Sequence, residues 1–201
     1  MVNYVCDEYI FYCRHLIHFS HENIIRFCKR PFSSVEEMDE TIIRNWNAKV
    51  KPGDRVYHCG DFCFGNREDI LKMTRRLHGH IILVEGNHDS IGDPKNYGFA
   101  SKHKLLEIKL NGKYITLCHY AMRVFNKSHF DSWHFYGHSH GTLPPEGKTW
   151  DVGVDCNNFE PLEFEEIKKI MESRPHNLNW LERLEGYNQS EYEEAKKIEM
   201  S

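Results

Sequence analysis

The sequence predicts an α/β sandwich built on a mixed β-sheet. Segments typical of strands and helices alternate through the first half of the chain, and strand-like segments dominate the second half. Four short hydrophobic segments end in a glycine or histidine that leads into polar, ligand-type residues. Because ligand sites in open α/β sheets gather at the ends of strands, we expect these four ends to converge on one site.

The composition fits one soluble domain. The chain has 201 residues, of which 40% are hydrophobic, and its formal net charge of -4 does not indicate a nucleic-acid partner. It has no apolar run of the roughly 18 residues that a membrane span needs. An odd number of cysteines, seven, and an N-terminus without the pattern of a secretory signal favour reduced thiols in the cytoplasm. We expect a single domain over residues 1–201, with a core at about 10–160 and a helical extension at about 161–201.

The first predicted elements are a strand at residues 9–13 and a short helix over residues 21–29. A longer helix follows, because Ser34 and Glu37 form a capping-box pattern. Apolar side chains then recur on one face of that helix, at Met38, Ile42, Ile43 and Trp46. This spacing predicts that the helix packs against the sheet.

The rest of the chain continues the alternation and then becomes rich in strands. Asn111-Gly112 is a strong signal for a two-residue hairpin between two of these strands. The tail from residue 178 is charged and helix-prone, with a break expected at residues 187–190. In order, the remaining elements are a strand at 55–59, a helix at 68–77, strands at 81–84, 104–110, 113–118, 133–136 and 149–154, and a helix at 163–172.

The chemistry is concentrated in four segments that follow strands: Gly60-Asp61, Gly86-Asn87-His88-Asp89, His119, and Gly137-His138-Ser139-His140. Taken alone, each segment is compatible with an ordinary turn. On an extended segment, His138 and His140 would face the same side and could reach one cluster. Together the segments supply imidazole, carboxylate and amide oxygen without a thiolate in a ligand position. This mixture suits Mn²⁺, Fe, Zn²⁺ or Ni²⁺, and Asp61 could bridge two cations through its two oxygens.

The ordered segments resemble the calcineurin-like metallophosphoesterase superfamily over roughly residues 10–160. The stretches His18–Ile25 and Arg30–Ser34 are similar to a subgroup of small bacterial and phage phosphoesterases. The resemblance implies a four-layer α/β/β/α sandwich with mixed sheets and a metal site at the carboxyl ends of strands. It also implies hydrolysis of a phosphomonoester or a phosphodiester by metal-activated water, with two divalent metal ions as cofactors.

The resemblance also implies roles for individual residues. The first metal would be held by His18, Asp61 and His140, and the second by Asp61, Asn87, His119 and His138. His88 would lie over the phosphate as an electrostatic stabiliser or general acid, and Asp89 would orient His88.

One position departs from the family pattern. Leu16 stands where the family's first motif, Asp-x-His, has its aspartate, and leucine cannot bind a cation. Four interpretations remain open: a substitute carboxylate from Asp7 or Glu22, an enzyme with one firm and one weak metal, a degenerate phosphoesterase that binds without turnover, or a small reading-frame slip upstream of His18. A nuclease is a further functional alternative, and it would require a basic groove beside the site.

Several other residues have ordinary structural explanations. The cluster of Arg26, Lys29 and Arg30 is interpreted as a solvated helix face. Phe62 and Phe64 are expected to pack beneath the metal loop. Asp155 is expected to serve in a turn at the rim of the site.

Overall fold

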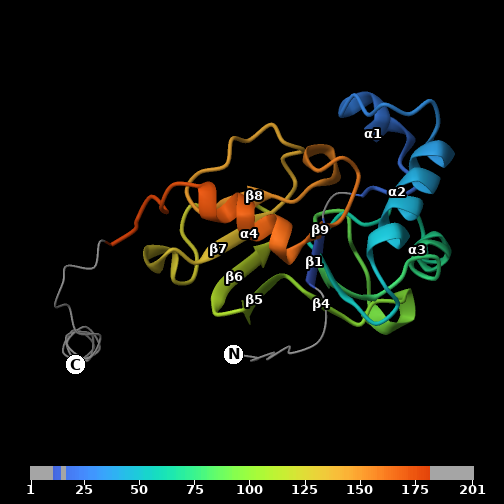
Figure 1. Ribbon diagram of the computed structural model, residues 1–201. Coiled ribbons are helices and arrows are strands. Elements are labelled where there is room, and N and C mark those ends of the chain that lie inside the picture. The colour runs from blue at the N-terminus through green and yellow to red at the C-terminus, as the bar shows by residue number, and fades with distance from the viewer. Residues whose placement is uncertain (1–10, 15–16, 182–201) are drawn as a thin grey trace.

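The computed structural model describes residues 11–14 and 17–181, and these contain two mixed β-sheets with helices packed against them (Figure 1). The first sheet has the strand order β4-β3-β2-β1-β9, in which only β9 is antiparallel to its neighbour. The second has the order β5-β6-β7-β8, in which only the β5–β6 pair is antiparallel. The predicted α/β fold with mixed sheets is therefore confirmed.

The bounds of the elements follow the predicted order closely. They are β1 (Phe11–Arg14), α1 (Glu22–Phe27), α2 (Val35–Lys49), β2 (Arg55–His58), α3 (Arg67–Thr74), β3 (His80–Val84), η1 (Pro94–Tyr97), β4 (Ser101–His103), β5 (Leu105–Leu110), β6 (Lys113–Cys118), η2 (Ser128–Phe130), β7 (Trp133–Tyr136), β8 (Thr149–Asp151), η3 (Val154–Cys156), β9 (Leu162–Glu163) and α4 (Phe164–Ser173).

Strands β2 and β3 of the first sheet bury residues on both faces. Along β2, Val56 joins a core shared with α2 and α3, whereas Tyr57 points into a second core shared with the second sheet and α4. Strand β3 alternates in the same way, with Leu83 in the first core and Val84 in the second. Figure 1 shows the corresponding layers, with α2 and α3 on one side of β1 and with β5 to β8 and α4 on the other.

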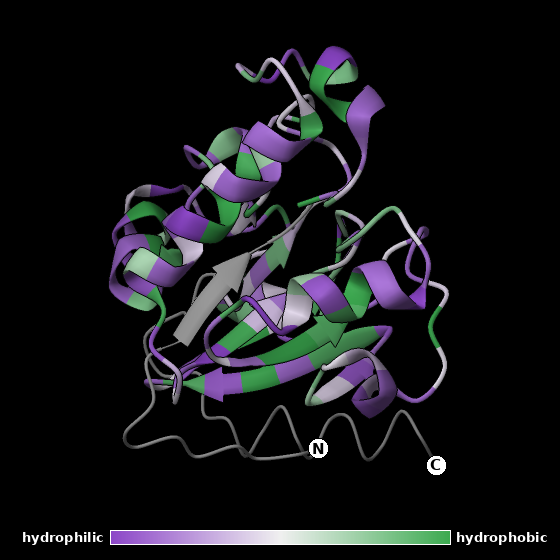
Figure 2. Ribbon diagram, turned by 90° about the vertical axis from the view of Figure 1, so that its right-hand side faces the viewer, coloured by the Kyte–Doolittle hydropathy of each residue, from purple (hydrophilic) through white to green (hydrophobic). Residues whose placement is uncertain are grey.

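Helix α2 forms as its sequence predicts. The Ser34 side chain accepts a hydrogen bond from the Glu37 backbone N–H at 3.2 Å, which caps the first turn. The Glu37 carboxylate reaches one residue further back than a standard capping box and accepts from the Ser33 N–H at 2.8 Å. At the other end, the buried Trp46 donates its indole N–H to the His78 carbonyl at 2.8 Å. Figure 2 shows that hydrophobic and hydrophilic residues lie side by side along the helices.

The hairpin signal is also confirmed. Strands β5 and β6 pair in antiparallel register, with Leu110 opposite Lys113 across the two-residue turn. Asn111 and Gly112 both have positive φ, 45° and 78°, as the favoured hairpin turn requires. The turn fixes the register between β5 and β6, and His119 follows the end of β6 that is farther from the turn.

Some elements are absent from the sequence prediction. Strands β4 and β9 have only three and two residues, and the segment predicted as one strand at 149–154 is instead β8 followed by the short helix η3. Residues Phe164, Ile167 and Met171 of α4 are buried in the second core. The predicted helical tail lies outside the described residues from 182 onward.

Parallel pairing determines where the functional segments end. Strands β2 and β3 run parallel in the first sheet, and β6 and β7 run parallel in the second. Each of these four strands leads into a predicted ligand segment. Each also ends beside a parallel neighbour that leads into another such segment. Among the described residues, no helix is long and apolar enough to cross a membrane.

The cap of α2 gives a test of this part of the fold. We expect Ser34→Ala to lower the free energy of unfolding by about 1 kcal/mol, because the Glu37 N–H loses its acceptor. Ser34→Asn, which keeps a capping oxygen, should retain most of the stability. Urea denaturation of the three proteins measures the difference, and equal losses for both variants would contradict the capping role.

Candidate metal centre

The second predicted metal group is assembled from both sheets. Asp61 follows β2, Asn87 follows β3, His119 follows β6 and His138 follows β7. His119 Nε2 lies 2.9 Å from Asn87 Oδ1, 3.1 Å from His138 Nδ1 and 3.5 Å from Asp61 Oδ2. The structure therefore brings together the four residues for which the sequence predicted a shared metal.

The hydrogen bonds of His119 determine which of its nitrogens faces this group. Its Nδ1 lies 3.1 Å from the Cys59 carbonyl oxygen, which only accepts, so Nδ1 carries a proton and donates it. Burial lowers the pKa of His119, which favours the neutral ring, although Asp61 acts in the opposite direction. In the neutral ring, Nε2 therefore has its lone pair directed at Asn87, His138 and Asp61.

The two oxygens of Asp61 have different partners. Oδ1 accepts the backbone N–H of His88 at 3.0 Å. Oδ2 lies 3.5 Å from His119 Nε2 and 3.8 Å from His18 Nε2. One carboxylate oxygen is thus within reach of a histidine from each predicted metal group, as a bridging ligand would be.

The first predicted metal group is less compact. The rings of His18 and His140 stack with their centroids 5.3 Å apart. His18 Nε2 is buried and has no hydrogen-bond partner among the described residues. Burial, followed by the charges of His140 and Arg30, lowers the pKa of His18 to about 2, so its ring is neutral, which is the form that binds a metal.

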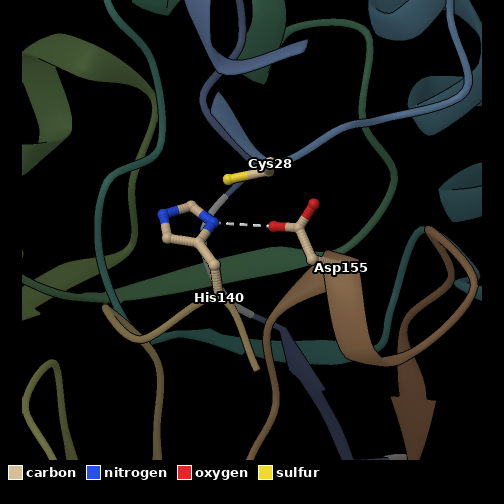
Figure 3. Close-up of side chains that lie close together, drawn as sticks. All are labelled: Cys28, His140 and Asp155. Atoms are coloured by element: carbon tan, nitrogen blue, oxygen red, sulfur yellow. Dashed lines mark hydrogen bonds and ion pairs between the residues drawn. The ribbon is translucent and has the colours of Figure 1, made fainter. Parts of the chain in front are cut away.

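His140 is held from its outer side by Asp155. Its Nδ1 lies 2.8 Å from Asp155 Oδ2, and the Cys28 thiol lies beside both (Figure 3). Burial alone would lower the pKa of His140, but the hydrogen bonds with Asp155 and Cys28 raise it to about 9. The Asp155 carboxylate also forms an ion pair with Arg30 at 2.7 Å.

Asp89 fastens the loop after β2 to the loop after β3. Its Oδ2 accepts the backbone N–H groups of Asp61 at 2.6 Å and Gly86 at 2.9 Å, and its Oδ1 accepts that of Phe62 at 2.9 Å. Burial raises the pKa of this carboxyl, against the effect of the three amides. These contacts connect Asp89 to the backbone around Asp61, and its predicted role in orienting His88 stays a prediction.

The backbone at the site is tightly constrained. Gly60 has φ +107°, and a Cβ there would lie 2.5 Å from the Gly86 nitrogen; a Cβ on Gly86 would lie 2.3 Å from Asp61 Oδ1. Asp61, His138 and His140 themselves have left-handed φ values of 52°, 61° and 48°. The extended geometry considered for His138 and His140 therefore does not apply: the turn directs His138 toward His119 and His140 toward His18.

His88 lies at the exposed rim of the site. Its ring centroid is 6.1 Å from that of His18 and 5.6 Å from that of Phe64. His21 stacks on Phe64 at 4.3 Å, and Phe64 is 48% exposed. Phe62 packs in the first core as predicted, whereas the exposure of Phe64 contradicts its predicted burial beneath the metal loop. Aromatic and imidazole rings thus border the position from which a substrate could approach.

The donor set fits divalent cations. The nearest ligand atoms of Asp61, His119 and His138 lie within 4.8 Å of one another, and they combine carboxylate oxygen with imidazole nitrogen. The buried, unpartnered Nε2 of His18 adds a donor whose burial is unfavourable unless it gains a partner. Cations at this position would satisfy these atoms together.

The sequence interpretation missed one supporting residue, Asp151, misjudged Arg30, and did not anticipate the contact that Asp155 makes with His140. Arg30 is only 4% exposed and buried against Asp155, so the prediction of a solvated cation there is wrong. Asp151 accepts the Ser139 hydroxyl at 2.6 Å and the Gly141 N–H at 3.0 Å, and so shapes the loop that carries His138 and His140. Asp155 lies in η3, the expected turn, but it contacts His140 directly. Leu16 lies outside the described residues.

Comparison with known families gives an independent measure of similarity. A family model described as the calcineurin-like phosphoesterase superfamily domain matches residues 38–150. An uncharacterized protein of Methanocaldococcus jannaschii is 34% identical over 164 residues, which cover 77% of this chain and 87% of that protein.

Two solved structures are also similar. A protein of unknown function from Aquifex aeolicus shares 27% sequence identity at a TM-score of 0.63, with 81% of this chain and all of that chain covered. The phosphoesterase Yfce from E. coli shares 18% identity at a TM-score of 0.37, over 72% of this chain and 78% of that one.

Asp89 gives a direct test of how the site is held. The amide introduced by Asp89→Asn has one acceptor oxygen, so at least one of the three backbone N–H groups loses its partner. We expect the free energy of unfolding to fall by about 1–3 kcal/mol, the cost of an unsatisfied buried donor. Asp93→Asn is the matched control, because the exposed Asp93 caps η1 and asparagine caps equally well. Equal denaturation midpoints for both variants would contradict the role of Asp89.

Proposed function

This chain belongs to the calcineurin-like phosphoesterase superfamily, and we propose that it hydrolyses a phosphomonoester or a phosphodiester with the help of two divalent cations. The observation that carries the proposal is the position of Asp61 Oδ2, which lies 3.8 Å from His18 Nε2 and 3.5 Å from His119 Nε2. A carboxylate oxygen shared between two imidazoles suits a pair of cations better than it suits a structural turn.

The ligands divide into two sets that share Asp61. His18 and His140 would complete the first set. Asn87, His119 and His138 would complete the second, in which the donor atoms already face one another. Bound cations would lower the pKa of water toward neutrality and offset the negative charge of a phosphoryl group.

The protein residues would orient the substrate beside these ligands. His88 is exposed at the rim, and its backbone N–H donates to Asp61 Oδ1, so the backbone of His88 lies next to the shared carboxylate and its ring lies 6.1 Å from that of His18. From there its imidazole could donate a hydrogen bond or a proton to the leaving oxygen of the ester. The neighbouring rings of Phe64 and His21 would restrict how the ester enters.

A degenerate phosphoesterase that binds metal without turnover is the second candidate. Leu16 favours it, because the first metal group lacks the family's own carboxylate. The two candidates differ in turnover and agree on metal binding, so an assay of both properties separates them.

His88→Ala should reduce hydrolysis of p-nitrophenyl phosphate or bis-p-nitrophenyl phosphate with Mn²⁺ by about 10²–10⁴-fold, the usual contribution of a general acid. Its metal content should match that of the wild type, because His88 is outside both ligand sets. His80→Ala is the matched control, since the exposed His80 begins β3 and lies at the opposite end of the strand. Metal binding without turnover in the wild type would favour the degenerate candidate.

Cation binding should also stabilise the fold. We expect Mn²⁺ at 100 times its dissociation constant to raise the free energy of unfolding by about 2.7 kcal/mol, because it binds only the folded ligand set. His119→Ala should abolish most of this gain, whereas His80→Ala should preserve it. Thermal denaturation with and without Mn²⁺, with EDTA as the metal-free reference, measures both. An equal gain for the wild type and His119→Ala would place the cation elsewhere.

A further inference from the structure

We propose that Arg30 and Asp155 form a positioning pair that directs Nε2 of His140 toward the first cation by holding Nδ1 on the other side of the ring. The inference rests on the proposed function, since it takes His140 to be a cation ligand. Neither Arg30 nor Asp155 would touch the substrate or the cation.

Arg30 is held by bonds that leave it little freedom. Its Nε lies 2.7 Å from Asp155 Oδ1 and its Nη2 lies 2.9 Å from Asp155 Oδ2, a two-pronged pair. Its Nη1 donates to the Ile17 carbonyl at 2.9 Å. The side chain of Arg30 is fully buried and that of Asp155 is 9% exposed, so solvent screens the pair weakly.

Asp155, held in this way by Arg30, in turn fixes the orientation of the His140 ring. Its Oδ2 accepts from His140 Nδ1 at 2.8 Å, and Figure 3 shows the second ring nitrogen on the side of the ring away from Asp155. A carboxylate accepts and does not donate, so the proton between these atoms belongs to Nδ1. Once the proton on Nε2 is displaced, that nitrogen offers its lone pair on the side of the ring away from Asp155.

The same guanidinium also restrains the segment that carries His18. The Ile17 carbonyl that accepts from Arg30 immediately precedes His18 in the chain, and the rings of His18 and His140 stack at 5.3 Å. Arg30 thus connects the two histidines of the first ligand set, one through the backbone and the other through Asp155. Movement of this one side chain would change both ligands.

Cys28 suggests a different interpretation, in which Cys28, His140 and Asp155 hold a separate metal ion. Their nearest ligand atoms do lie within 4.8 Å of one another. However, both oxygens of Asp155 already accept hydrogen bonds from Arg30, and a cation there would be placed beside a buried positive charge. The contacts therefore favour a supporting role for Asp155 over a metal site of its own.

Asp155→Asn tests the pair sharply because Arg30 has donors only. The introduced amide has one acceptor oxygen in place of two. In the position of Oδ2 this oxygen still serves His140 Nδ1 and Arg30 Nη2, but the NH₂ group then faces the Arg30 Nε–H; in the position of Oδ1 the oxygen serves Arg30 Nε, and the NH₂ group faces His140 Nδ1. That contact favours the ring with the proton on Nε2, which blocks the proposed ligand atom. We expect the affinity of the first site for Zn²⁺ to fall by about 10–100-fold, the usual effect of losing such a support.

Two measurements test the effect of Asp155→Asn on Zn²⁺ binding and on the His140 ring. Isothermal titration with Zn²⁺ gives stoichiometry and affinity, and proton NMR of the metal-free protein detects the hydrogen-bonded Nδ1 proton of His140, assigned by its loss in His140→Ala. Asp155→Asn should lose this signal and weaken one Zn²⁺ while sparing the other. Asp131→Asn is the matched control, because Asp131 pairs with His176 outside the site.

Arg30→Lys provides a second variant in case Asp155→Asn does not fold, as judged by circular dichroism. Lysine keeps the charge but loses the two-pronged geometry, so we expect a smaller loss of Zn²⁺ affinity. Wild-type Zn²⁺ affinity in a folded variant that lacks the Nδ1 signal would overturn the inference. A wild type that shows the signal and binds no Zn²⁺ would instead overturn the proposed function.

Discussion

The site depends above all on one buried carboxylate, which accepts hydrogen bonds from three backbone N–H groups. Asp89 binds the amides of Asp61, Phe62 and Gly86, and thereby joins the loop after β2 to the loop after β3. The two loops approach so closely that Gly86 has no room for a Cβ. This junction allows Asp61 to adopt a left-handed backbone, because its amide finds an acceptor there. The shared carboxylate of the candidate centre is thus held through its own backbone.

Local sequence signals made much of the fold and of the candidate site predictable. The cap at Ser34 and the turn at Asn111-Gly112 depend on contacts between residues close in sequence, so a short segment contains all the necessary information. The ligand segments were found for a related reason: a hydrophobic strand that ends in glycine or histidine marks a position, and parallel pairing of β2 with β3 and of β6 with β7 brings such positions together.

What escaped prediction depends on distant partners. Strand β9 has two residues and exists because β1 lies beside it. Nothing near Arg30 indicates burial, since its partner Asp155 is 125 residues away. Alternation along an extended segment is the simplest geometry for the spacing of His138 and His140, whereas Asp151 draws the backbone of this turn into a tighter form.

The same separation of 125 residues has a consequence for biosynthesis. A ribosome releases the segment carrying His18 and Arg30 well before η3, because Asp155 is synthesised 125 residues after Arg30. Until then the Arg30 guanidinium lacks its counter-charge, and β1 lacks its neighbour β9. Contacts of this range slow folding because the intervening chain must first be ordered. The residues proposed as the second ligand set, of which His138 is the last in the chain, are therefore all synthesised before Asp155 can support the proposed first set.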